Sequence, residues 1–237
     1  MTALVPLISA HRGGLAVDGV SAADRYRHAI ELGVDFVEFD VRRTSDGVTV
    51  IHHDDDTVSG RAVSELTYRE LAEELGPESL TFDQLLDVAA GRVGLHLDLK
   101  EAGYEAEIVR TVLDRSPLDR LVITSGDAVI RTIKEQFPHV RAGLSIGEDI
   151  NEPAPWLKLR MRLSELFPGG RLERCHADFL AVHQQLAGLT VLRYCESHDV
   201  PAWVWTVDDE PGLARFLADR RVTTLITNRP DIAMRLR

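Results

Sequence analysis

Three short segments within the first 53 residues carry side chains suited to proton transfer and metal binding. His11 and Arg12 follow one apolar run, Glu38 and Asp40 alternate within a second, and His53 follows a third. Histidine exchanges protons near neutral pH, and paired carboxylates hold hard cations such as Mg²⁺ or Ca²⁺. The guanidinium fork of arginine matches phosphate oxygens. Together these residue types predict metal-assisted chemistry on a phosphoryl group.

A further polar group alternates along the apolar segment from Val93 to Lys100. His96, Asp98 and Lys100 would share one face of a strand there. Buried charges are costly unless they pair or bind a ligand, so we predict that Asp98 and Lys100 serve the site. A purely structural ion pair is the alternative. His96 is expected deeper, in the core or supporting the site.

Later segments offer weaker candidates. Trp205 and His183 would stand at strand ends and line the site, although core packing is the alternative for Trp205. Asn228 also follows a strand and is expected to face the site. Asp54 is a candidate for orienting His53, whereas no role is predicted for the neighbouring aspartates. The basic residues of the segment 156–167 either contact a charged substrate or form a solvated helix face: Lys158, Arg160 and Arg162.

The elements that must position these residues alternate between β-rich runs and helical periodicity. Nearly continuous apolar runs are typical of parallel strands buried on both faces. Eight such runs in 237 residues predict an α/β fold, a (β/α)₈ TIM barrel forming a single domain over residues 1–237. An open doubly wound sheet is the alternative. The predicted strands are Leu7–His11, Phe36–Val41, Val93–Leu99, Leu121–Thr124, Val140–Ser145, Asp178–His183, Ala202–Val207 and Thr223–Thr227.

A β-hairpin interrupts this alternation after the second strand. Asp46–Gly47 between two β-rich runs predicts a two-residue turn in which Ser45 pairs with Val48. That register would place Asp40 opposite His53. An insertion follows at about 54–92, and its two helical stretches begin with capping-box patterns. We expect this insertion to form a small cap over the barrel mouth.

Composition excludes several functional classes. The formal net charge of −11 argues against a nucleic-acid partner or a general anionic-membrane surface. Cys175 and Cys195 match no metal or redox spacing. The apolar stretch Leu4–Ala10 lacks a preceding basic region, and no segment approaches the length of a membrane span. We therefore predict a cytoplasmic protein without stable membrane insertion. Its oligomeric state stays open.

These motifs, in this order, resemble the glycerophosphodiester phosphodiesterase family over nearly the whole chain. Any one of them alone is a weak signal, whereas jointly they are specific. The matching pieces are His11-Arg12-Gly13, Gly33 to Val41, Thr44 to Ile51, His53-Asp54, Leu97 to Lys100, Trp205 to Val207, and Ile226 to Asp231.

The resemblance implies a (β/α)₈ barrel that cleaves small phosphodiesters with a divalent cation, Mg²⁺ or Ca²⁺. It implies that His11 and His53 form the acid–base pair. In this pattern Arg12 and Lys100 bind the phosphate, and Trp205 lies beside the substrate. The metal ligands are Glu38, Asp40 and Asp98.

Two departures from the family pattern bear on the substrate. The stretch Leu15–Ala22 lacks the usual Glu-Asn pair, and Asp98 is one methylene shorter than the usual glutamate. A lysophospholipid or a specialised diester is therefore an alternative substrate. A catalytically silent barrel that binds a phosphorylated ligand, and a metal-dependent isomerase or aldolase, are further alternatives on the same fold.

Overall fold

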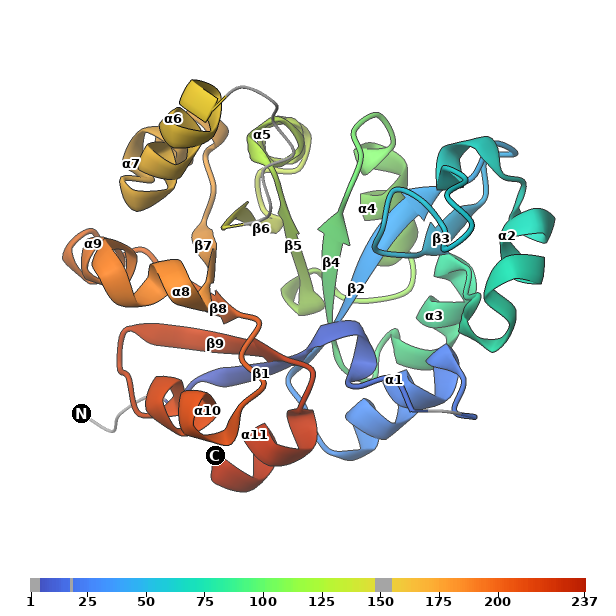
Figure 1. The fold of residues 1–237 in the computed structure, drawn as a ribbon, viewed down its shortest axis with the longest axis horizontal. Coiled ribbons are helices and arrows are strands. Elements are labelled where there is room, and N and C mark those ends of the chain that lie inside the picture. Colours follow the sequence, from blue (N-terminus) through green and yellow to red (C-terminus); the bar gives the residue numbers. More distant parts are fainter. Residues whose placement is uncertain (1–4, 18, 148–154) are drawn as a thin grey trace.

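Parallel strands form a closed barrel in the computed structural model, which describes residues 5–17, 19–147 and 155–237 (Figure 1). Each barrel strand pairs in parallel with its neighbours, and β1 pairs with both β9 and β2, which closes the sheet. The predicted (β/α)₈ barrel is confirmed. Its strands are β1 (Leu7–Ala10), β2 (Phe36–Arg43), β4 (Gly94–Leu99), β5 (Leu121–Ser125), β6 (Arg141–Ile146), β7 (Phe179–His183), β8 (Ala202–Trp205) and β9 (Val222–Thr227).

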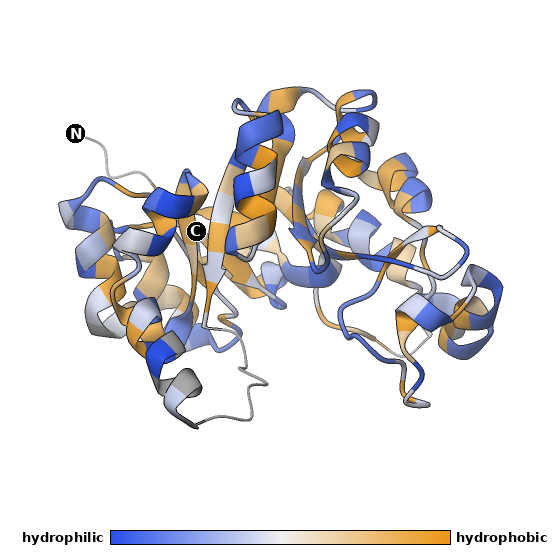
Figure 2. Ribbon diagram, turned by 90° about the horizontal axis from the view of Figure 1, so that it is seen from above, coloured by the Kyte–Doolittle hydropathy of each residue, from blue (hydrophilic) through white to orange (hydrophobic). Residues whose placement is uncertain are grey.

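Helices surround the barrel and connect its strands (Figure 1). They carry hydrophobic and hydrophilic residues side by side, as amphipathic helices between a sheet and solvent do (Figure 2). Among the described residues, none of them is long and apolar enough to cross a bilayer. They are α1 (Ala22–Glu31), α2 (Tyr68–Leu75), α3 (Phe82–Ala89), α4 (Glu105–Leu113), α5 (Asp127–Gln136), α6 (Pro155–Leu166), α7 (Gly169–Cys175), α8 (Gln184–Leu186), α9 (Leu192–Ser197), α10 (Glu210–Leu217) and α11 (Pro230–Leu236).

The two helices of the insertion do not cover the barrel mouth, so the predicted cap is wrong for them. Both begin with the expected capping boxes. However, α3 packs beside α1 in the outer layer and buries Phe82 and Leu85 in the main core. Leu71 of α2 packs with Val50 of the short strand β3 (Thr49–Ile51) in a separate small cluster. Apolar burial outside the barrel thus decides where these helices lie.

Aromatic rings fill the barrel interior at one end. Trp203 stacks on Phe179 with ring centroids 4.6 Å apart, and Phe36 lies 5.4 Å from Trp203. Gly94 and Gly143 make room for these rings, because a Cβ atom there would lie 2.4 Å from the ring of Phe36 and 2.2 Å from that of Phe179. The interior is therefore packed at this end, and the polar cavity opens at the C-terminal ends of the strands.

Candidate active site

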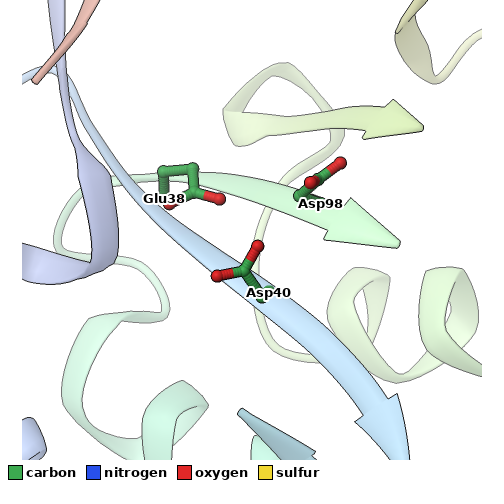
Figure 3. A group of neighbouring side chains, drawn as sticks. All are labelled: Glu38, Asp40 and Asp98. Carbon is green, nitrogen blue, oxygen red and sulfur yellow. The ribbon is translucent and has the colours of Figure 1, made fainter. Parts of the chain in front are cut away.

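Three carboxylates converge at the C-terminal ends of two adjacent strands (Figure 3). Glu38 and Asp40 lie two residues apart on β2, and the register of β4 places Asp98 beside Asp40. One oxygen from each of the three lies within 4.8 Å of the others. Glu38 and Asp40 are only 3% and 2% exposed. The structure therefore brings together the residues predicted to bind metal.

Two cations partly neutralise this cluster. Arg12 Nε lies 3.0 Å from Asp40 Oδ2, and Lys100 Nζ lies 3.0 Å from Asp40 Oδ1. Lys100 also pairs with Asp98. Burial and the repulsion from Asp40 and Asp98 raise the pKa of Glu38 well above its usual value.

Asp40 behaves in the opposite way. Burial alone would raise its pKa, but the neighbouring Lys100 and Arg12 lower that pKa below its usual value. Three clustered carboxylates against two cations leave an excess of negative charge. A hard divalent cation with oxygen ligands fits this donor set.

A tight turn at the end of β1 carries His11 and Arg12. The strand was predicted to include His11 but ends at Ala10, and a 3₁₀ turn begins at His11. Arg12 has a φ of 51°, which is unusual outside glycine and is a feature of strained functional sites. Its backbone N–H donates to Glu38 Oε2 over 3.0 Å. The turn thus faces both residues toward the acidic cluster.

Burial sets the protonation of His11. It lowers the pKa of the imidazole, and the positive charge of Arg12 lowers it further. The ring is therefore held neutral at pH 7, with Nε2 lying 3.9 Å from Glu38 Oε2. A neutral histidine can accept a proton.

The hairpin before His53 has a different strand register from the predicted one. Val41 pairs with Ile51, and the Thr44 amide donates to the Val48 carbonyl, which leaves a three-residue turn. Gly47 has a φ of +83°, as the last residue of such a turn requires. The predicted pairing of Asp40 with His53 is therefore wrong by one residue.

His53 nevertheless lines the same cavity as Asp40. The strand β3 ends at Ile51, so strand alternation no longer decides the direction of His53. Arg42 instead holds the segment, because its Nε and Nη2 donate to the His53 carbonyl over 3.0 and 2.8 Å. Nδ1 of His53 lies 2.7 Å from Asp54 Oδ1, and this hydrogen bond lowers the pKa of Asp54.

The cavity has a volume of about 1220 Å³. Residues at the ends of β7 and β8 form part of its wall. His183 and Trp205 line it, with their ring centroids 5.1 Å apart at 80°. Arg162 reaches the cavity, whereas Arg160 is exposed. The predicted contact of Lys158 lies outside the described side chains. The later strands thus supply a second wall of the cavity.

Asp208 was missed by the sequence reasoning. It accepts hydrogen bonds from Asn228, which in turn contacts His11. The signal was a carboxylate three residues beyond the end of β8, next to the predicted Trp205 segment. Strand-end position alone could have marked Asp208 as a candidate.

His96 supports the acidic cluster from below. Its ring is 1% exposed and lies 3.0 Å from both Ser9 Oγ and Thr124 Oγ1. Thr124 Oγ1 donates to Asp98 Oδ1 over 3.1 Å. Burial lowers the pKa of His96 to about 3. The predicted supporting place of His96 therefore agrees with its contacts.

The low pKa of His96 makes stability depend on pH. An unfolded histidine binds a proton below about pH 6.5, whereas folded His96 does so only near pH 3. Stability contributed by the neutral ring is thus lost as pH falls through this interval. Wild type should lose unfolding free energy when the pH falls from 7 to 5. In His96→Gln this loss should be smaller by about 2 kcal/mol. Urea unfolding in EDTA measures this difference, with His28→Gln on the exposed face of α1 as control. Equal losses in wild type and His96→Gln would contradict the prediction.

Known proteins resemble this chain in sequence. Residues 21–134 match the Glycerophosphoryl diester phosphodiesterase family. The chain is 25% identical to a glycerophosphodiester phosphodiesterase of Caldanaerobacter subterraneus subsp. tengcongensis, over 97% of both chains. The chain therefore resembles the glycerophosphoryl diester phosphodiesterase family. This resemblance identifies it as a phosphoric diester hydrolase.

Solved structures related to the family share its fold. A glycerophosphoryl diester phosphodiesterase structure from Agrobacterium tumefaciens superposes with a TM-score of 0.80 at 18% identity, covering 98% of this chain and 97% of that one. An Oleispira antarctica phosphodiesterase in complex with the product sn-glycerol-3-phosphate has a TM-score of 0.75 at 22% identity, covering 98% and 96%. This chain therefore shares its barrel fold with both structures.

Proposed function

We propose that this enzyme hydrolyses glycerophosphodiesters to an alcohol and glycerol phosphate, using a divalent cation and two histidines. The observation that carries the proposal is one cavity lined by His11, His53 and the acidic cluster of Glu38, Asp40 and Asp98. The Oleispira antarctica relative holds sn-glycerol-3-phosphate as product, which supports a glycerol-headed substrate here. The cavity of about 1220 Å³ leaves room for the leaving alcohol.

Glu38, Asp40 and Asp98 would hold the cation, which is Mg²⁺ or Ca²⁺ because all three donors are carboxylates. A bound divalent cation polarises phosphoryl oxygens and lowers the pKa of a hydroxyl or water that attacks phosphorus. Arg12 and Lys100 lie against the same carboxylates and would bind the non-bridging oxygens of the phosphate. Trp205 would form the wall beside the substrate.

His11 and His53 would move the protons. The hydroxyl next to the phosphate on glycerol loses its proton to one histidine and forms a bond to phosphorus. The bond from phosphorus to the alcohol breaks, and the second histidine protonates the leaving oxygen. Water then opens the cyclic phosphate with the two histidines in exchanged roles, so both regain their starting states.

A lysophospholipid is a second candidate substrate. Leu15 and Val17 follow the turn that carries His11 and Arg12, and they are 52% and 57% exposed. Two exposed apolar side chains so close to the catalytic turn would favour an apolar chain on the substrate.

The substrate test compares bis(p-nitrophenyl) phosphate with glycerophosphocholine in Mg²⁺, Ca²⁺ or EDTA, for wild type and His11→Ala. Metal-dependent turnover of both compounds, lost in the variant, is the expected result. Turnover of the synthetic diester alone would shift the proposal to lysophospholipids. Absence of turnover of diesters and lysophospholipids by wild type would favour the silent barrel or the isomerase and overturn the proposal.

The cellular setting is also part of the proposal. We propose a cytoplasmic enzyme of lipid-derived phosphodiester metabolism, with a small-molecule substrate and no nucleic-acid partner. The net charge of −11 supports the last point, since nucleic-acid surfaces require basic patches. Fractionation of the native host followed by immunoblotting tests the location.

A further inference from the structure

A chain of hydrogen bonds connects His11 to two residues beyond the ends of β8 and β9. His11 Nδ1 lies 2.8 Å from Asn228 Oδ1. Asn228 Nδ2 in turn donates to Asp208 Oδ2 over 2.8 Å. Asn228 directly follows β9, and Asp208 lies three residues after β8, so both stand at the mouth of the barrel. The imidazole of His11 is thus positioned from the far end of the chain.

The orientation of the Asn228 amide follows from this chain. An ionised carboxylate only accepts hydrogen bonds, so the NH₂ group must face Asp208 and the oxygen must face His11. The backbone secures the same orientation. The Asn228 N–H donates to Asp208 Oδ1 over 2.8 Å, and its carbonyl accepts from the Leu15 N–H over 2.9 Å. Asn228 is therefore held at both its main chain and its side chain.

The amide orientation decides the tautomer of His11. Since Asn228 Oδ1 accepts, Nδ1 of His11 must carry the proton. In a neutral imidazole the other nitrogen then carries the lone pair. Nε2 lies 3.9 Å from Glu38 Oε2, on the side of the acidic cluster where the phosphate chemistry would occur. His11 is therefore prepared to accept a proton from a reacting group.

The partner of His53 has the opposite character. Its Nδ1 lies 2.7 Å from the carboxylate of Asp54. His11 receives a neutral amide oxygen at the same ring position. The two histidines thus differ in the group that contacts Nδ1.

We propose that Asp208 and Asn228 are positioning residues that hold His11 in the Nδ1–H tautomer, so that Nε2 of His11 accepts the proton in the first step. This inference rests on the proposed function. Nε2 of His11 takes the proton of the attacking hydroxyl as its oxygen bonds to phosphorus. The bond to the alcohol breaks, and His53, the second histidine of the proposed pair, protonates the leaving oxygen. In the second step water gives a proton to His53, and His11 returns its proton to the released glycerol oxygen.

The test reads the tautomer directly. Long-range ¹H–¹⁵N correlation spectra of ¹⁵N-histidine-labelled protein distinguish the protonated nitrogen of His11 from the unprotonated one, with His11→Gln to identify the signals. Wild type should show Nδ1 protonated and Nε2 unprotonated. Asp208→Asn should free the amide of Asn228 to turn, populate the Nε2–H form and lower kcat by about 100-fold or more, as expected for a wrong tautomer. Asp209→Asn, which changes the adjacent N-cap of α10, is the matched control and should retain wild-type kcat.

A swapped pair separates positioning from simple stability. In Asp208→Asn combined with Asn228→Asp, the carboxylate at 228 accepts from Nδ1–H and the amide at 208 donates to it. The Nδ1–H tautomer and at least one tenth of wild-type kcat should return. An Nε2–H tautomer in wild type, an unchanged tautomer in Asp208→Asn, or no recovery in the swapped pair overturns the inference. The spectra need no substrate, so a wild type that cleaves no diester refutes the proposed function while the tautomer result stands.

Discussion

Alanine in place of His53 should lower kcat by about 10²–10⁴-fold, because one of the two proposed proton-transfer groups is removed. The side chain of His53 is 41% exposed, and the hydrogen bonds that hold its segment use its backbone carbonyl. The fold should therefore survive the substitution. KM should change much less than kcat, since the variant keeps Arg12 and Lys100, the proposed phosphate-binding residues. Steady-state kinetics with glycerophosphocholine and a thermal melt measure both effects.

The adjacent histidine is the matched control for this experiment. His52 is half-buried, and its side chain is absent from the cavity lining in the described part of the chain. Its backbone N–H, which donates to the Asp40 carbonyl over 3.1 Å, is kept in His52→Ala. His52→Ala should keep kcat within about threefold of wild type. A near-normal rate for His53→Ala, or an equal loss in both variants, would refute the role of His53.

Glutamine in place of Glu38 should stabilise the metal-free protein while removing its activity. Three carboxylates lie within 4.8 Å of one another, against two cations. At a pH where Glu38 is ionised, replacing it with a neutral amide removes a buried, repelled charge, and a gain of about 1–3 kcal/mol in unfolding free energy is expected. The glutamine oxygen can still accept the Arg12 N–H.

Loss of a metal-binding carboxylate has the opposite effect on function. If Glu38 holds the proposed cation, the rate should fall by at least about 100-fold, since such a cation contributes several kcal/mol to the transition state. Thermal melts in EDTA and in about 10 mM Mg²⁺ or Ca²⁺ separate the effect on stability from the effect on metal binding. This cation concentration is roughly 100 times the Kd of a weak site, which gives a measurable stabilisation. Wild type should gain stability on addition of the cation, whereas Glu38→Gln should not. A variant that is destabilised in EDTA, or that retains the metal-dependent gain, contradicts the description of the acidic cluster.

Within regular strands, side-chain directions followed from the sequence. Glu38 and Asp40 share a face because they alternate on β2, and Asp98 joins them because parallel strands keep their register across a barrel. His11 and Arg12 were placed at the mouth by the same logic, although the strand ends one residue earlier than predicted. Period-two alternation and the burial of apolar runs contain enough information for these placements.

Beyond the strand ends, the sequence pattern no longer predicts the direction of a side chain. His53 lies two residues after β3, and contacts with Arg42 and Asp54 direct it, rather than a pleat. The turn before β3 has three residues because Thr44 and Gly47 close it, a choice that Asp46–Gly47 alone does not determine. Loop conformation depends on hydrogen bonds to distant segments, which a local pattern does not contain.

Strand periodicity and burial are local properties, so the barrel, the residue types of the cavity and the convergence of its carboxylates were predictable from the amino-acid order. The outer position of α3 and the contact from Asp208 through Asn228 to His11 were not predictable in this way. Both depend on contacts between segments far apart in the chain. His11 and Asn228 are separated by 217 positions, and closure of the barrel between β1 and β9 brings them together.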